Sequence, residues 1–417
     1  HVAATLLALG EVCREEEDMA GARQHLQEAL RMERAVHGDK NHFNVAATLH
    51  ALGEVCRLEG DMVGTGHHLQ EALRMQRAVH GDKNHDNVAT TLHALGQVCR
   101  REGDMAGARQ HLQEALRMGL AVHGDKNHSD VAATLLALGE VCREEGDMAG
   151  ARQHLQEALR MQRAVHGDKN HSDVAATLRA LGQVCHREGD MAGARQHLQE
   201  ALRMERAVHG DKDHPSVAVT LHALGGVCRD EGDMVGTRHH LQEALRMLRA
   251  VHEDKNHHNV ATTLHALGVV CREEGDMAGA RHHLQEALQM KRAVHGDKNH
   301  PEVAATLHGA RGRSAGEEGD MAGARQHLQA ALRMGLAVHG DRGHPLVSAS
   351  LPELGQVCHH CSASSPSLLR CPCGGALYCS KACQKAHWRA HKPICAPKTS
   401  NEAKSESSKS NKKHSKK

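Results

Sequence analysis

Seven cysteines crowd into residues 358–395, close to the end of the 417-residue sequence. Together with one histidine they form pairs, which are Cys358-x2-Cys361, Cys371-x-Cys373, Cys379-x3-Cys383 and His391-x3-Cys395. Zinc prefers thiolate and imidazole ligands, and four of them around one ion make a closed structural site. Eight ligands therefore predict two Zn²⁺ ions and leave no open position for an activated water. The pattern indicates structural rather than catalytic metal chemistry.

Other interpretations of the cluster remain open. His387 lies four residues before His391 and could take its place, although we prefer His391. A disulfide framework is disfavoured, because seven cysteines are an odd number and the histidine falls in register with them. A metal pattern in a chain with 14 cysteines indicates a reducing, intracellular setting.

The elements ahead of this cluster form an internal repeat. The period is 43 residues, with a last interval of 44, which gives eight repeats and the start of a ninth. The repeats open at Val2, Val45, Val88, Val131, Val174, Val217, Val260, Val303 and Val347. The sequence starts inside a repeat, so we expect further residues upstream.

Each repeat predicts a helical hairpin. In the second repeat, apolar residues recur at helical spacing over 45–59, Gly60 and Asp61 interrupt the pattern, and the spacing resumes over 62–80. Asn87 or Asp173, just ahead of later first helices, is predicted as an N-cap. Neither helix can bury its apolar stripe alone, so stacked hairpins predict an all-α superhelical solenoid.

The pattern resembles the tetratricopeptide repeat family. Its long period and the H-P-x-V-A-x-T-L stretch from His214 to Leu221 resemble the kinesin light chain subtype. The resemblance covers residues 1–346 and implies about eight hairpins whose first helices line a peptide-binding groove. Cys56 and Met62 stand where the family usually has aromatic residues, so we expect packing by smaller side chains. Attachment to kinesin does not follow from this subtype.

Positive charge and hydrogen-bond donors gather on the predicted groove. Histidine recurs at one position of the first helices, and arginine follows seven residues later on the same face. The predicted groove residues are His50, Arg57, His93, Arg100, Arg143, His222, Arg229, His265 and Arg272. The resemblance implies cargo contacts at the histidine position, so we hypothesise that an extended, acidic-leaning peptide binds here. The alternative is a solvated face, because interspersed glutamates dilute the charge.

Two recurrent residue types of the repeats are predicted to be structural. One cysteine per repeat, from Cys13 to Cys271, is assigned to the core rather than to a redox switch. Equivalent positions of stacked helices lie ~8–10 Å apart, whereas a disulfide needs Cα atoms within about 7 Å. Most of the 40 histidines recur once per repeat, so solvated surface is favoured over metal binding.

The eighth repeat is damaged. At residues 308–316 the sequence loses nearly all the expected apolar anchors and carries one extra residue. We expect a frayed helix there and suspect a local frameshift in the coding sequence.

The cysteine cluster resembles the MYND finger family. The stretch from Tyr378 to Cys395 matches the second half of that family's pattern. The resemblance implies interleaved ligands, with one zinc on Cys358, Cys361, Cys379 and Cys383 and the other on Cys371, Cys373, His391 and Cys395. The family usually has two residues between its third and fourth ligands, whereas only Pro372 intervenes here, which leaves Cys371 open as a ligand.

The same resemblance implies protein docking by the finger. MYND fingers dock short proline-containing peptides, and the family's peptide-contacting residues correspond to Gln384 and Trp388. Structural packing is the alternative role for Trp388. A finger of 38 residues has too small a core to fold unaided, so metal binding must supply folding free energy.

Charge and hydropathy narrow the class of function. The chain has 52 basic and 51 acidic residues, so no overall field favours nucleic acid or membrane partners, and no apolar run reaches membrane-spanning length. The tail at 396–417 holds seven lysines and two glutamates and is predicted to be disordered. A solubilising role is favoured there over a nuclear address or a nucleic-acid contact.

We therefore predict a repeat array at 1–346, the start of a ninth repeat or a linker at 347–357, a finger at 358–395 and a tail at 396–417. The predicted function is a zinc-binding scaffold for proteins or peptides, cytoplasmic rather than nuclear, with no small-molecule substrate and no catalysis. Some MYND proteins are methyltransferases, but the repeats here run to the edge of the finger. The alternatives are a transcriptional co-regulator that contacts nucleic acid through its tail, or the regulatory part of an enzyme whose catalytic domain lies upstream.

Overall fold

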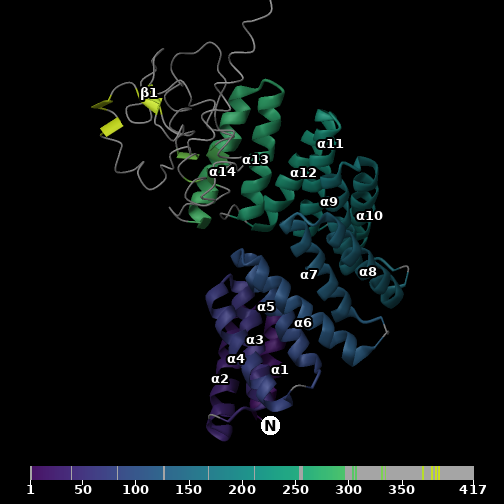
Figure 1. The fold of residues 1–417 in the computed structure, drawn as a ribbon, viewed down its shortest axis with the longest axis vertical. Coiled ribbons are helices and arrows are strands. Elements are labelled where there is room, and N and C mark those ends of the chain that lie inside the picture. Colours follow the sequence, from purple (N-terminus) through teal and green to yellow (C-terminus); the bar gives the residue numbers. More distant parts are fainter. Residues whose placement is uncertain are drawn as a thin grey trace, which may run out of the picture. The chain divides into compact units, whose positions relative to one another are not determined.

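The computed structural model describes most of residues 2–295 and short stretches beyond them. The described residues are 2–38, 40–81, 83–124, 127–167, 169–210, 212–252, 257–295, 303–304, 306–307, 330–331, 334, 369–370, 377–378, 381–382 and 384–385. They divide into two compact units, His1–Asp233 and Met234–Lys417 (Figure 1). The predicted damage at 308–316 and the predicted tail lie outside the described residues.

The first unit is a stack of helical hairpins. Its helices are α1 (Val2–Glu15), α2 (Met19–His37), α3 (Phe43–Glu59), α4 (Met62–His80), α5 (Asp86–Glu102), α6 (Met105–His123), α7 (Ser129–Glu145), α8 (Met148–His166), α9 (Ser172–Glu188), α10 (Met191–His209) and α11 (Pro215–Asp230). Each odd-numbered helix from α1 to α9 packs on the helix that follows it, and each hairpin stacks on the next. The first helices also touch one another, as α5 touches α7. This confirms the predicted solenoid of hairpins.

The second unit repeats the pattern and adds a small strand pair. Its elements are α12 (Met234–His252), α13 (His258–Glu273), α14 (Met277–His295), β1 (Leu369–Arg370) and β2 (Leu377–Tyr378). Helix α13 packs between α12 and α14. The strands are antiparallel, with Leu369 opposite Tyr378. Among the described residues, no helix is long and apolar enough to cross a membrane.

The second helices α2, α4, α6, α8, α10 and α14 start at an aspartate cap. In α4 the Asp61 carboxylate accepts a hydrogen bond of 2.9 Å from the backbone N–H of Gly64. A Cβ atom on Gly64 would lie 2.3 Å from that carboxylate, so the glycine makes room for the cap. Gly60 ends the preceding helix at a φ of 84°, a conformation that favours glycine. The Gly-Asp-Met-x-Gly stretch therefore encodes the tight turn inside the hairpin, and in the first repeat Glu17 takes the place of the first glycine with a φ of 64°.

The first helices start at a histidine cap, and the predicted caps were wrong. The His85 Nδ1 atom accepts a hydrogen bond of 3.2 Å from the backbone N–H of Asn87, which lies inside α5. His171 does the same for Asp173 at the start of α9. Asparagine and aspartate are the commoner caps. Here, however, each helix begins two residues before the first apolar residue, so Asn87 and Asp173 lie inside their helices and the histidine before them is the cap.

The loop histidines also stack on the helix that precedes them. His37 lies on His42, with ring centroids 3.5 Å apart and planes 11° from parallel. Equivalent stacked pairs are His80–His85, His123–His128, His166–His171, His209–His214 and His252–His257. These residues were predicted as solvated surface, whereas the structure uses them to join consecutive hairpins.

The core runs along the hairpin interfaces. Leu49 and Leu69 are fully buried, and the small Gly53 lets their helices approach, since a Cβ there would lie 2.9 Å from Leu69. The repeat cysteines are free thiols, and all but Cys13 and Cys99 are buried. Burial raises the pKa of Cys56, Cys142 and Cys185. The predicted core role of these cysteines is confirmed in the described repeats.

Candidate partner-binding face and zinc finger

The predicted groove residues lie on the first helices, and those of the first unit form a surface that we call the first-helix face. On it, Arg57, Arg100, Arg143 and Arg229 lie beside acidic residues of the same chain. Arg57 donates to Glu54 at 2.7 Å, three residues earlier on α3. Arg229 lies 3.3 Å from Asp230 on α11. The interspersed acidic residues thus balance the charge locally, as the alternative interpretation of the sequence expected.

Arg100 forms the most connected of these pairs. Its guanidinium reaches from α5 to two carboxylates on α7, Glu140 at 2.9 Å and Glu144 at 3.0 Å. Arg143 lies beside Glu144 as well, at 3.5 Å, with only 16% of its side chain exposed. The Nε atoms of Arg100 and Arg143 are nevertheless buried with no hydrogen-bond acceptor among the described residues. Each of these two arginines therefore keeps one unused N–H donor in this arrangement of the side chains.

The groove histidines face the next repeat as well as the surface. His50 contacts Thr91 through Nδ1 at 3.1 Å, and His93 contacts Thr134 in the same way at 3.1 Å. The Thr134 hydroxyl donates to the Asp130 carbonyl, so it accepts from His93. The other ring nitrogen of His93 meets the Gln97 amide at 2.6 Å. Burial lowers the pKa of both histidines, which fits neutral rings, and in His93 both nitrogens are engaged.

His222 follows the same trend more strongly. It is half-buried on α11, and burial lowers its pKa from 6.5 to about 4. His265 and Arg272 are half-buried on α13 in the second unit. The structure thus places every predicted groove residue on a first helix, and peptide binding by these side chains stays a prediction.

The fifth repeat carries interactions that the sequence pattern did not reveal. Arg179 pairs with Glu205 at 2.8 Å, although only 2% of the glutamate side chain is exposed. Burial raises the pKa of Glu205 and Arg179 opposes this. His186 meets Asp230 at 2.7 Å. In the sequence these pairs are a basic and an acidic residue 26 or 44 positions apart, and they can be recognised only when the register between the helices is known.

One position of the second helices is buried at every described junction but differs in residue type. It holds Glu33, Gln76, Gly119, Gln162, Glu205, Leu248 and Lys291. In the first repeat the side chain fills the space next to the following first helix, where the Glu33 carboxylate accepts a 2.9 Å bond from Thr48. Gly119 has no side chain to do this, so a pocket of about 140 Å³ lies between α5, α6 and α7.

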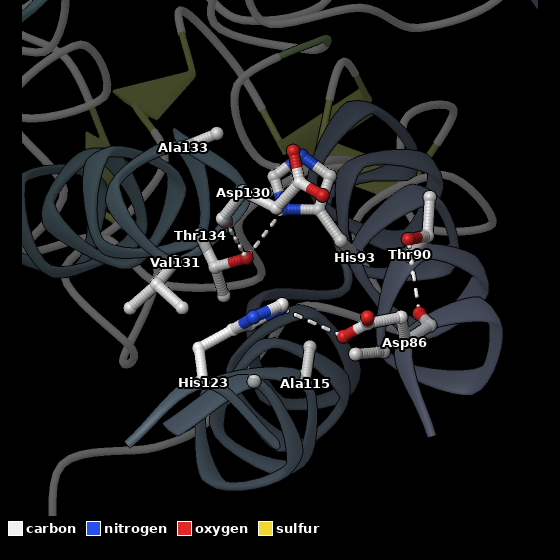
Figure 2. Close-up of a pocket in the computed structure, with 11 residues that line it drawn as sticks. Asp86, Thr90, His93, Ala115, His123, Asp130, Val131, Ala133 and Thr134 are labelled. Carbon is white, nitrogen blue, oxygen red and sulfur yellow. Dashed lines mark hydrogen bonds and ion pairs between the residues drawn. The ribbon is translucent and has the colours of Figure 1, made fainter. Parts of the chain in front are cut away.

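We call this cavity the junction pocket (Figure 2). Its floor is buried and apolar, with Ala115, Gly119 and Val131. Its mouth carries two carboxylates, Asp86 and Asp130, whose side chains are 47% and 70% exposed. His123 reaches from α6 to Asp86 at 2.8 Å, while His93 and Thr134 close the opposite wall. Sequence analysis missed this site, although Gly119 was visible as a departure from the repeat.

The same junction lacks an ion pair that its neighbours have. Arg34 pairs with Glu71 at 2.9 Å, Arg77 with Glu114 at 2.8 Å and Arg163 with Glu200 at 2.9 Å, in each case between consecutive second helices. The equivalent of these arginines in the third repeat is Leu120, which is 41% exposed. Its expected partner, Glu157, pairs instead with Arg160 on its own helix. The junction that follows the third repeat therefore differs from its neighbours in two ways: Gly119 leaves a pocket, and Leu120 replaces the arginine of the ion pair.

Histidine clusters in the described part of the chain are poor metal sites. His166, His171 and Asp173 place ligand atoms within 4.8 Å of one another. The two rings are stacked with centroids 3.5 Å apart and planes 12° from parallel, so their lone pairs run side by side instead of converging. Two further groups, His239-His240-Glu243 and His282-His283-Glu286, lie along single helices. In the latter, Glu286 already pairs with Arg249.

The eight predicted zinc ligands and Trp388 lie outside the described residues. Of the predicted finger residues the structure places Gln384, which is half-buried in a short helical stretch. The β1–β2 pair joins the residues that directly precede Cys371 and Cys379 in the sequence. Seven thiolates and one imidazole are a donor set that fits zinc, which would hold the finger together when bound.

Comparisons with known proteins support both parts of the chain. The tetratricopeptide repeat family matches residues 1–62, 44–121, 130–207, 173–248 and 216–293, which together make up more than half of the sequence. The MYND finger family matches residues 358–395. No curated protein matches the sequence.

Solved structures share the fold at low sequence identity. A Rap protein complexed with competence and sporulation factor has a TM-score of 0.58 and 12% identity, over 85% of this chain and 96% of that one. The apo form of RapI has a TM-score of 0.54 and 13% identity, over 70% and 98% of the two chains. The kinesin light chain-like repeats of Podosopora anserina align with a TM-score of 0.40 and 16% identity, over 51% and 99%. At these identities the likeness concerns the fold alone.

Proposed function

Because this chain belongs to the tetratricopeptide repeat family and carries a MYND finger, both of them protein-interaction modules, we propose that it is an adaptor that binds one partner on its first-helix face and another on its finger. The partner of the first-helix face is an extended peptide segment. The finger binds two zinc ions and docks a proline-containing motif through Gln384 and Trp388. The chain acts by holding proteins together and catalyses no reaction.

The observation that carries the proposal is the state of Arg100 and Arg143. Each has a buried Nε–H with no acceptor among the described residues, and a donor left in that state costs about 1–3 kcal/mol. A peptide carbonyl or carboxylate would satisfy them once the guanidinium groups turn outward, because neither Nε atom is exposed in the free chain. The ion pairs around Arg100 are 24–29% exposed, and exposed pairs contribute only about 0–1 kcal/mol. A partner's carboxylate can therefore replace Glu140 or Glu144 at little cost.

Two separate modules suit an adaptor. When both partners belong to one complex, binding of the first raises the effective concentration of the second. One of the similar structures is of a Rap protein complexed with competence and sporulation factor, so a fold of this kind can hold a partner.

Affinity capture with matched variants tests the proposal. The baits are the full chain, a Cys379→Ser variant that removes a predicted zinc ligand, and a variant with Arg57, Arg100 and Arg229 changed to alanine. The control changes Arg31, Arg117 and Arg160, which are exposed on second helices, to alanine. We expect one set of proteins to be lost with Cys379→Ser, a different set to be lost with the first-helix variant, and none with the control. Identical captures with all four baits would rule out the assignment of both surfaces.

A further inference from the structure

The chain itself shows what the junction pocket accepts. At the equivalent junctions, the same position holds Glu33, Gln76, Gln162, Glu205, Leu248 and Lys291, each of them at most 4% exposed. Their stems are aliphatic and of similar length, whereas their ends are apolar in Leu248, an amide in the glutamines, and acidic or basic in Glu33, Glu205 and Lys291. Gly119 removes that side chain at one junction only, among the described repeats, and leaves the space open.

The volume fits one medium-sized aliphatic group. The pocket measures about 140 Å³, and an apolar protein cavity of about 150 Å³ is large enough for a benzene molecule. The floor of Ala115, Gly119 and Val131 offers no unpaired polar atom to an entering group. The Thr134 hydroxyl is already bonded to His93 and to the Asp130 carbonyl. An apolar tip is therefore favoured at the floor, because a buried charge there would lack a partner.

The mouth has the opposite character. The carboxylates of Asp86 and Asp130 are exposed, and no lysine or arginine lines the pocket. His123 contacts Asp86 from one side, and both ring nitrogens of His93 have partners within the repeats. The charge at the entrance is thus negative, so a cation adjacent to the entering apolar group gains Coulomb energy and an anion loses it.

From these observations we infer that the junction pocket anchors a partner segment by a leucine-sized aliphatic side chain whose neighbouring residue is basic. The aliphatic group fills the space that Gly119 leaves, and the cation meets Asp86 and Asp130. The inference rests on the proposed function, because the pocket opens beside His93 on the first-helix face. It also fixes where the partner's aliphatic residue must bind, which is the junction of α5 and α7.

Small probes test the pocket without a known partner. Isopentylammonium carries the leucine side chain next to a cation. 3-Methylbutan-1-ol keeps the shape without charge, 3-methylbutanoate reverses the charge, and methylammonium removes the aliphatic group. Saturation-transfer NMR titrations on the full chain should rank isopentylammonium first and the alcohol second, with no saturable binding of the other two. Equal binding of 3-methylbutanoate, or no saturable binding of isopentylammonium, would overturn the inference.

Three substitutions test whether the probes bind in the junction pocket. Each introduces a residue that another repeat of the chain has at the equivalent position. Gly119→Gln copies Gln76 and should reduce isopentylammonium binding at least tenfold. The pair Asp86→Ser and Asp130→Asn copies Ser129 and Asn87. This double variant should bind isopentylammonium only as tightly as the wild-type chain binds 3-methylbutan-1-ol. Its affinity for 3-methylbutan-1-ol should be unchanged. Unaltered binding to the Gly119→Gln variant would place the probe elsewhere and refute the pocket.

A displayed library of random peptides separates this inference from the proposed function. Peptides selected on the wild-type chain and lost on Gly119→Gln should share an aliphatic–basic pair. If peptides bind both forms equally, the first-helix face stands and the pocket fails. If no peptide binds either form while isopentylammonium binds the wild type, the pocket stands and the proposed function of the face fails.

Discussion

His93 in α5 and Thr134 in α7 are joined across a repeat junction by a hydrogen bond of 3.1 Å between Nδ1 and Oγ1. His50 and Thr91 make the same bond one junction earlier. The bond uses a neutral imidazole in a place where burial lowers the pKa of the ring. Histidines that the sequence assigned to partner binding therefore also hold neighbouring repeats together, and the stability of the array should depend on their protonation.

The first prediction concerns His222→Leu and pH. Burial lowers the pKa of His222 to about 4 in the folded chain, against about 6.5 when unfolded. The folded chain keeps its full stability above about pH 6.5, where His222 is neutral in both states. It loses stability as the pH falls toward 4, because the unfolded chain binds the proton first. Between pH 7 and pH 5 the wild type should lose about 2 kcal/mol more stability than the variant.

Denaturant unfolding of both proteins at the two pH values checks this. Leucine fits the position, because Leu136 occupies the equivalent place in the fourth repeat. Parallel losses of stability in wild type and variant would show that His222 does not titrate as described.

The second prediction concerns the buried pair Arg179 and Glu205. Arg179→Leu alone should destabilise the array by about 2–3 kcal/mol, because it leaves a buried carboxylate without its cation. Adding Glu205→Gln should recover most of that loss. The double variant copies the fourth repeat, which has Leu136 and Gln162 at these positions. Unfolding midpoints of the two single variants and the double variant give the coupling, and simple additivity would contradict the pairing.

The third prediction concerns Gly119→Gln and stability. Glutamine is a better helix former than glycine by roughly 0.5–1 kcal/mol, and it fills the junction pocket, so the variant should unfold at higher denaturant. A Cβ atom on Gly119 would lie 3.1 Å from Val131, and the second repeat accommodates Gln76 and Val88 at these positions. Gln162→Gly is the reciprocal control and should destabilise. A less stable Gly119→Gln variant would mean that the third junction differs in backbone as well as in side chain.

The fourth prediction concerns zinc. Elemental analysis of reduced protein should find two zinc ions per chain, and fewer in Cys379→Ser. A strong chelator should change the fluorescence of Trp388, the single tryptophan, while the helical circular dichroism signal persists, because the predicted ligands all lie within 358–395. Cys13→Ser, which removes a thiol of the repeats, serves as control and should keep its zinc. Loss of the helical signal on chelation would contradict the separation of the two parts.

The local structure of the repeats could be read from the sequence. Apolar residues at helical spacing, interrupted by Gly60 and Asp61, predicted helices that the structure places at Phe43–Glu59 and Met62–His80. The reason is that helix formation and turn chemistry depend on residues within a few positions of one another. The same locality allowed the cysteine spacing to identify the finger family. It failed at the helix starts, where a stacked histidine replaces the more usual asparagine cap.

Contacts between repeats were decided by the tertiary structure. The sequence shows Arg179, Glu205 and Gly119 as variations within a repeat, but their effect depends on which side chain of the next hairpin lies opposite. That register comes from packing along the whole interface, and its partners are 26–44 residues away. Periodicity thus determined the hairpins and their order, whereas the junction pocket and the buried ion pairs arise from side chains that meet only after the hairpins have stacked.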